Sequence, residues 1–528
     1  MLRFCLFLLA GLAAYPASAQ TPQETGPTEA TGPSSTEDAE RWERESRAMY
    51  EALQPVGMAV AVVREGQPVW IAGYGETQAG SGNSVTADTA FPIHSMTKSF
   101  TAAALALLVD EGKLAWSDPV RKHIPEFAMS DPYVSEHLTL RDLLVHNSGL
   151  ALGAGDLLGW PDQVSTPQDV IAALPHLPLD SGFREGFAYD NILYTVAGEV
   201  VTRVSGQSWA GFVEERLFAP LGMTSCSTSQ ATAKAVPTAI QHSRRAGGEP
   251  VVRVDIANLE DPAGSISCSA RDIARWTHFQ LGDGTLPDGT RLMAPERLRE
   301  MHAPVVVLRP PNFMRRLAGA HFNNAALGWF ASDFAGTLMI EHGGAGTGGL
   351  TNMILLPEED AAVVVLVNDM IPAHLVSYRI ADLIVRGDGA ADWTGWVIEQ
   401  QARRVQDALE SQRADPVRPA GAGDPAFPPG DYAGTYRDAW YGDIVVSHQG
   451  GGLRIHFTRS KLLDGPLLPW EGETFLARWP ERSLDADALV TFTQDESGRI
   501  AGMKIAPLSP ETDFSYDYQH LAPVRIEQ

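Results

Sequence analysis

The sequence is poor in cysteine, which limits the chemistry that it can support. Its 528 residues include three cysteines, Cys5, Cys226 and Cys268, and no C-x-x-C pair. This scarcity argues against a zinc or thiol-redox site, and we expect neither a metal nor a cofactor. Cys5 lies in a segment that we expect to be removed. The other two could form one disulfide in an oxidising compartment or remain buried thiols, and the sequence leaves both open.

Positive charge and long apolar runs are also scarce. The chain has 40 Lys and Arg against 65 Asp and Glu, a formal net charge of −25, so we expect no electrostatic binding to nucleic acid or to an anionic membrane. The apolar run at 4–14 is too short for a comfortable membrane span. Arg3 before it and the small residues at 17–19 after it predict a signal peptide over 1–19. We therefore expect a periplasmic or secreted protein without a membrane anchor.

Several familiar catalytic motifs are missing. The chain has no G-x-S-x-G, no H-E-x-x-H and no Walker lysine, which argues against the usual α/β-hydrolase, zincin and P-loop readings. Residues 344–349 match G-x-G-x-x-G literally. A strand at 351–356 is expected next, where a dinucleotide site needs a helix, so we reject dinucleotide binding there.

The most informative stretch is residues 91–113. From Phe100 to Val109 it is almost wholly apolar, which predicts a buried helix. Ser95 and Lys98, three residues apart, share a face at the start of this helix. A buried amine can act as a base and activate a serine, whose own N–H can stabilise an oxyanion. The alternative is an N-cap serine beside a surface lysine, and the apolar run favours catalysis.

Apolar strand runs flank a long helical insertion. They predict an α+β domain over 41–386, with one antiparallel five-stranded sheet flanked by helices and a helical lobe beside it. The five expected strands are 58–63, 68–71, 337–341, 351–356 and 361–367. A polar segment at 20–40 is expected to be a flexible leader.

The end of the chain has a different character. A helical connector and a Pro/Gly linker are expected over 387–430, and the short alternating runs of 431–528 predict a small all-β domain, a barrel or a sandwich. This domain could cover the active-site cleft, drive homo-oligomer formation, or act as an independent module with its own ligand.

Two further segments carry candidate chemistry. Tyr189 and Asn191 precede a helix. A tyrosine can shuttle a proton and an asparagine can hold a substrate amide, although Tyr189 taken alone fits an ordinary half-buried tyrosine better. His342 and Gly344 lie at the end of a strand. The glycines there would let a substrate backbone lie close, and the histidine could supply a donor or a charge.

Taken in order, Ser95-x-x-Lys98, Tyr189-x-Asn191 and His342-Gly-Gly are much more specific than any one of them. The sequence resembles the serine β-lactamase and penicillin-binding-protein superfamily, in the class C β-lactamase-like branch with D-Ala-D-Ala carboxypeptidases, D-aminopeptidases and esterases. The resemblance covers about 41–386. The region after residue 430 is similar to the lipocalin-like domain found behind such catalytic domains.

This resemblance implies a role for each matching position. Ser95 would be acylated, Lys98 would be the base or proton relay, and Tyr189 would activate water or protonate the leaving group. Substrate would be bound by Asn191, His342 and Gly344, and the backbone N–H groups of Ser95 and Ala345 would form the oxyanion hole. No metal is implied.

Two departures from the family pattern affect the expected substrate. His342 stands where many relatives carry lysine, which weakens the grip on a carboxylate and lowers the expectation of true β-lactamase activity. Asp190 stands where small residues are more usual, and an acid there would disfavour anionic substrates. We expect an exported serine hydrolase that forms an acyl-enzyme on peptides, amides or esters. The alternatives are an esterase or lactonase, and a catalytically silent protein that binds peptides or penicillins.

Overall fold

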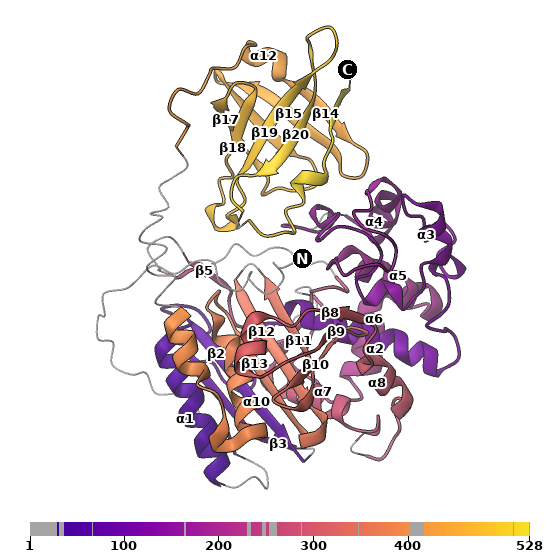
Figure 1. Cartoon of the computed structure of the whole chain (residues 1–528), viewed down its shortest axis with the longest axis vertical. Coiled ribbons are helices and arrows are strands. Elements are labelled where there is room, and N and C mark those ends of the chain that lie inside the picture. Colours follow the sequence, from indigo (N-terminus) through magenta and orange to yellow (C-terminus); the bar gives the residue numbers. More distant parts are fainter. Residues whose placement is uncertain are drawn as a thin grey trace. The chain divides into compact units, whose positions relative to one another are not determined.

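The computed structural model describes residues 29–30, 36–65, 67–162, 165–229, 234–244, 250–252, 261–286, 288–346, 348–400, 417–510 and 512–526 (Figure 1). The expected signal peptide, most of the leader and residues 401–416 of the connector lie outside this set. Within it, no helix combines the length and apolar character needed to cross a membrane.

The chain divides into two compact units. The first comprises Met1–Asp118, Ala197–Arg253 and Leu259–Gln412, and the second comprises Pro119–Val196, Val254–Asn258 and Arg413–Gln528. The helical segment at 119–196 therefore belongs to the same unit as the C-terminal β region.

The first unit is built on an antiparallel sheet with the order β1-β3-β2-β13-β12-β11-β10-β9-β8. All five strands expected from the sequence are present and adjacent: β3 (Gln67–Gly75), β2 (Gly57–Arg64), β13 (Ala361–Val367), β12 (Gly349–Leu356) and β11 (Thr337–Gly346). Over the described ranges the sheet has nine strands rather than five. The four that sequence reasoning missed are shorter and lie at its margins: β1 (Glu29–Ala30), β10 (Phe330–Phe334), β9 (Asn323–Ala325) and β8 (Val306–Leu308).

Helices cover both faces of this sheet, which explains why its central strands are apolar throughout. One core cluster joins α1 (Thr36–Leu53) and α10 (Val376–Arg386) to Val60 and Val62 of β2. Alternate residues of a strand face opposite sides, so Ala59 and Ala61 face away from this cluster. They are also buried, and α7 (Ala270–Leu281) packs against β2 and β13.

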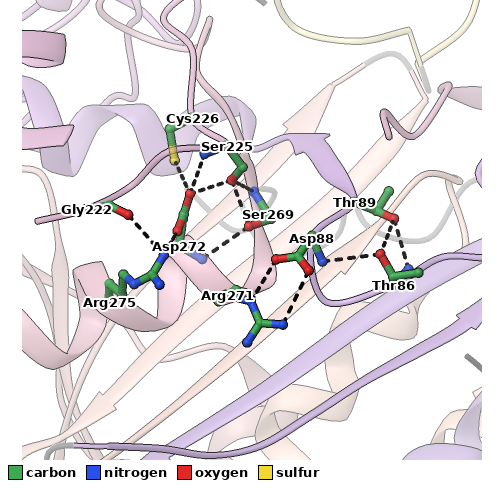
Figure 2. Close-up of polar contacts among 10 residues, drawn as sticks. All are labelled: Thr86, Asp88, Thr89, Gly222, Ser225, Cys226, Ser269, Arg271, Asp272 and Arg275. Carbon is green, nitrogen blue, oxygen red and sulfur yellow. Dashed lines mark hydrogen bonds and ion pairs between the residues drawn. The ribbon is translucent and has the colours of Figure 1, made fainter. Parts of the chain in front are cut away.

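A polar cluster fixes the start of α7. The Ser269 side chain accepts the Asp272 N–H as the N-cap, and the Ser225 hydroxyl lies 2.6 Å from the Asp272 carboxylate (Figure 2). Beside this cluster, a disulfide joins Cys226 to Cys268, which resolves the two alternatives left by the sequence.

This anchored region leads directly to the Ser95 segment. Cys268 belongs to β7 (Ser267–Ser269), which pairs with β4 (Ala90–Pro92). The 3-10 helix η2 (His94–Met96) follows β4, and α2 (Thr97–Asp110) follows η2. The Ser269 N-cap and the Cys226–Cys268 disulfide therefore fix β7, and β7 pairs with β4, the strand that precedes Ser95.

The second unit contains helical segments and a closed barrel. The helices include α3 (Pro132–His137), α4 (Pro167–Ala173) and the start of α5 (Ile192–Ser205). The expected β domain is an eight-stranded antiparallel barrel made of β14 (Gly434–Asp438), β15 (Gly442–Gln449), β16 (Gly452–Phe457), β17 (Asp464–Glu471), β18 (Thr474–Ala477), β19 (Ala488–Gln494), β20 (Ile500–Pro507) and β21 (Val524–Ile526).

Candidate active site

Ser95 and Lys98 lie together at the inner end of a buried helix. Ser95 is in η2, one short turn before α2 begins, and its Oγ is 3.1 Å from the Nζ of Lys98. Lys98 is 0% exposed, and its Nζ also donates to the carbonyl oxygen of Ala263 at 2.9 Å. Ser95 itself is partly exposed. The lysine is therefore held against the hydroxyl while the serine keeps access to solvent.

An acidic group lies close to this pair. Burial raises the pKa of Asp261, against the opposing effects of the Ala263 N–H and of the charge on Lys98. The Asp261 carboxylate accepts the Ala263 N–H at 2.9 Å. It so fixes Ala263, whose carbonyl oxygen accepts the hydrogen bond from Lys98. Sequence reasoning did not single out Asp261, because its link to Lys98 spans the helical insertion.

Glycines in β11 allow η2 to lie directly against the strand. A Cβ at Gly344 would be 2.2 Å from the Ile93 carbonyl oxygen, and one at Gly346 would be 2.1 Å from the His94 ring. These contacts within the chain place the Ser95 turn beside the strand. That the glycine at 344 also lets a substrate backbone lie close stays a prediction.

Among the strands that the structure describes, none pairs with one edge of β11 at the end that carries these glycines. Its register with β10 ends at Glu341, whereas its pairing with β12 continues to Gly346. Among the described strands, residues 342–346 therefore pair on one side only. Ala345, which is expected to supply an N–H of the oxyanion hole, lies in this stretch and is exposed.

His342 is a neutral imidazole in this structure. It is 3% exposed, and burial, with a smaller effect from the charge on Lys98, lowers its pKa to about 3. Its Nδ1 lies 2.6 Å from the Gly343 carbonyl oxygen, which can only accept, so Nδ1 carries the proton. Nε2 is then an acceptor. His342 does not replace the positive charge of a lysine.

Tyr189 and Asn191 belong to the second unit. The Tyr189 ring is buried, stacks on His146 with 4.3 Å between centroids, and meets Phe514 edge-to-face at 6.2 Å. The Asn191 Nδ2 donates to Asp156 at 2.8 Å. These contacts fix both side chains of the predicted Tyr-x-Asn motif.

Asp190, between these two residues, is turned into the interior. It is fully buried, and its Oδ2 lies 4.0 Å from Nδ1 of His146. Its backbone N–H approaches the same nitrogen at 3.2 Å. The family departure at this position therefore places an acid beside a buried histidine. The sequence analysis did not single out His146, because 44 positions separate it from Asp190.

The structure thus brings Ser95, Lys98, His342 and the β11 glycines into one unit, and describes Tyr189 and Asn191 in the other. No group of three or more His, Cys, Asp or Glu among the described residues is arranged to hold a metal ion.

Two family models match the chain. The one described as Beta-lactamase covers residues 40–385, and the Domain of unknown function DUF3471 covers residues 419–524. The chain is 28% identical over 418 residues to the unguisins hydrolase ungD′ of Aspergillus campestris, covering 74% of each protein. It is 28% identical over 342 residues to penicillin-binding protein 4 of Amycolatopsis lactamdurans, covering 63% of this chain and 85% of that protein.

Solved structures share the fold. The octameric penicillin-binding protein homologue from Pyrococcus abyssi aligns with a TM-score of 0.57 at 19% identity, covering 92% of this chain and 100% of that one. The penicillin-binding protein from Bacillus halodurans aligns with a TM-score of 0.53 at 21% identity, covering 64% and 98%.

Proposed function

Because the chain belongs to the beta-lactamase family of penicillin-binding-protein-like serine hydrolases, we propose that it hydrolyses its substrate through an acyl-enzyme at Ser95. The observation that carries this proposal is the 3.1 Å approach of a wholly buried Lys98 Nζ to the Ser95 hydroxyl. A serine on an exposed surface with a mobile lysine nearby would not be activated in this way.

The proposed reaction has two halves. The Ser95 Oγ attacks the substrate carbonyl carbon, its proton passes to Lys98, and the N–H groups of Ser95 and Ala345 stabilise the oxyanion. The leaving group departs with a proton, for which the family motif assigns Tyr189. Water then attacks the acyl-enzyme and releases the acid, restoring the Ser95 hydroxyl.

The proposed substrates are peptides or amides, including those with D-amino acids. An asparagine of the Tyr-x-Asn motif fixed by Asp156 supports recognition of a substrate amide. A relative named for hydrolysing unguisins supports a hydrolytic role rather than mere penicillin binding.

A second candidate is an esterase or lactonase acting on uncharged substrates. The neutral state of His342 favours it, because the site then lacks a fixed cation at the position where many relatives have lysine. The disulfide Cys226–Cys268 supports the further proposal that the protein works in an oxidising compartment outside the cytosol.

Steady-state kinetics on an activated ester and on N-acylated peptides ending in D-residues test this function. Lys98→Met should lower kcat/KM by roughly 10²–10⁴-fold, the usual contribution of a general base. Lys113→Met, which removes an exposed lysine paired with Glu111, is the matched control and should leave the rate unchanged. Equal rates in wild type and Lys98→Met would contradict the proposal.

A further inference from the structure

His94, the residue before the proposed nucleophile, has an unusual backbone conformation. Its φ is +50°, in the left-handed region that residues with a side chain rarely adopt. The peptide bond that follows His94 carries the N–H of Ser95, one of the two expected donors of the oxyanion hole. The backbone angles of His94 therefore set the direction of this N–H. A strained conformation of this kind persists only where the surrounding contacts determine it.

The His94 side chain lies against β11 at the end that carries the other expected donor. A Cβ at Gly346 would be 2.1 Å from Cε1 and 2.3 Å from Nδ1 of the His94 ring, so the ring fits there because residue 346 has no side chain. Gly346 directly follows Ala345, whose N–H is the second expected donor. The His94 ring thus packs against the strand segment that positions Ala345.

Gln241 holds the His94 ring by a hydrogen bond. The Gln241 Nε2 lies 2.7 Å from the His94 Nε2. An amide nitrogen can only donate, so the His94 Nε2 accepts and its Nδ1 carries the proton. Burial lowers the pKa of His94 to about 4, which keeps the ring in this neutral form at neutral pH.

Gln241 is itself fixed to the sheet. The N–H of the next residue, His242, donates to the carbonyl oxygens of Gly348 and Asn368, each at 3.1 Å. These two residues lie just before β12 and just after β13. A Cβ at Gly348 would be 2.7 Å from the Gln241 Cβ, so the two segments lie in close contact. The bond between Gln241 and His94 therefore connects the turn that carries the nucleophile to the central strands.

A separate contact secures the residue before His94. The Thr351 hydroxyl donates to the Ile93 carbonyl oxygen at 3.0 Å. This bond fixes residue 93, but rotation about the backbone bonds of His94 would still redirect the Ser95 N–H. The packing of the His94 ring and its bond to Gln241 remove that remaining freedom.

We propose that His94 and Gln241 are positioning residues for the oxyanion hole, and that together they fix the Ser95 N–H relative to the Ala345 N–H. This inference rests on the proposed function, because it concerns the same reaction. Donors of an oxyanion hole stabilise charge that develops in the transition state. Loss of their alignment therefore lowers kcat and leaves KM nearly unchanged.

The test uses the full-length protein and two substrates, a p-nitrophenyl ester and its thiono analogue, in which sulfur replaces the carbonyl oxygen. Sulfur is a weak acceptor, so the thiono ester gains little from the oxyanion-hole N–H groups. Gln241→Leu cannot donate to His94. It should lower kcat for the oxygen ester about tenfold to a hundredfold, as expected for a misplaced catalytic group. The ratio of kcat/KM for the oxygen ester to that for the thiono ester should fall as well.

His94→Asn is the second variant. Asparagine also tolerates the left-handed region, but it lacks the ring that packs on Gly346. We expect kcat and the substrate ratio to fall as they do in Gln241→Leu. If Gln241→Leu does not fold, His94→Asn gives the same readout.

Gln280→Leu is the matched control. The Gln280 Oε1 lies 3.0 Å from Nε2 of another histidine of the same unit, His302, and burial lowers the pKa of His302 to about 4 as well. Gln280→Leu should lower the melting temperature without changing kcat or the substrate ratio. An equal fall of both quantities in Gln280→Leu would overturn the inference, because general loosening of the unit would then explain the effect.

A wild-type kcat and substrate ratio in folded Gln241→Leu or in folded His94→Asn would also overturn the inference. Failure of the proposed function is recognised separately, because Ser95→Ala would then hydrolyse the oxygen ester as fast as wild type. That result would remove the basis of the inference. Hydrolysis that depends on Ser95 but not on His94 or Gln241 would remove the inference alone.

Discussion

At the scale of single residues, the charge of His342 decides what the site can hold. Its pKa of about 3 means that it gains a charge only near or below pH 3, far from working conditions. A carboxylate that binds beside His342 meets an imidazole that accepts a hydrogen bond at Nε2. We therefore expect a carboxylate-ended substrate to have no advantage at this position.

We predict that a peptide substrate and its C-terminal amide differ less than about threefold in kcat/KM, because a charge-assisted bond would be worth at least tenfold. His342→Gln, which is also neutral, should leave this ratio unchanged between pH 5 and pH 8. Steady-state kinetics on the free peptide and on its amide, for wild type and for His342→Gln, check this ratio. A tenfold preference for the free acid that disappears in His342→Gln would show that His342 carries a charge after all.

His374 is a second buried histidine, with a consequence for stability. Within the described part of the chain neither of its ring nitrogens has a hydrogen-bond partner, and burial lowers its pKa to about 3. His374 therefore binds a proton near pH 6.5 in the unfolded chain, but only near pH 3 in the folded chain. This residue lowers stability as the pH falls below 6.5.

Replacing His374 by Leu should remove this effect, which amounts to about 2 kcal/mol at pH 5. The melting temperatures of wild type and His374→Leu are to be compared at pH 7.5 and at pH 5. We expect wild type to lose more stability than the variant on acidification. Equal losses would mean that His374 is protonated or solvated in the folded protein.

At the scale of elements, the packing of η2 on β11 positions the nucleophile. Gly344→Ala should destabilise the protein by about 1–3 kcal/mol, the usual cost of overpacking, and reduce activity because the Ile93 carbonyl and the Ser95 turn must move. Gly343→Ala is the matched control, since its Cβ would have no neighbour nearer than 3.4 Å. Thermal melts and ester hydrolysis check both. Similar behaviour of the two variants would refute the packing argument.

The sequence predicted the elements whose pattern is local. Continuous apolar runs identified β2, β12 and β13, because both faces of these strands are buried. At the margin of the sheet, β9 has no such run, and β8 is a run of only three apolar residues whose middle one, Val307, is 84% exposed. Ser95 and Lys98 were found because one helical turn joins them.

The rest of the site depends on contacts between distant residues. Ser515 and Asp156, whose side chains are hydrogen-bonded, are 359 positions apart, and nothing in the composition around either one marks it as a partner of the other. Asp261 and His146 were missed for the same reason. Spacing along the chain detects a serine–lysine pair, but only the folded structure shows which carboxyl holds an asparagine.

At the scale of the whole molecule, the barrel interior contributes rigidity. Buried aromatic rings contact one another there, including Tyr432 on Phe475, Phe475 on Phe492, and Phe457 on Trp479. Small barrels are filled by such side chains. This packing favours a filled, rigid barrel over one that encloses a ligand. An oligomeric role for the barrel stays a prediction.

The disulfide should contribute to stability overall. Cys226 and Cys268 are separated by 42 residues, and closing a loop of this size stabilises the folded state by about 4 kcal/mol in the chain-entropy account. Cys226→Ser with Cys268→Ser should therefore melt well below wild type. Reduced wild type should melt at the same temperature as the double variant. Identical melting of oxidised and reduced wild type would show that the bond is absent.

The central claim is that Ser95 is acylated, and intact-mass spectrometry of the protein tests it most directly. Wild type and Ser95→Ala are exposed briefly to an activated acyl ester and, separately, to a penicillin. The account predicts a mass gain of one acyl group from the ester in wild type and none in Ser95→Ala. The lifetime of the ester adduct, compared with the lifetime of any penicillin adduct, then distinguishes a hydrolase from a penicillin-binding protein. No adduct in wild type, or an equal adduct in Ser95→Ala, would contradict the account.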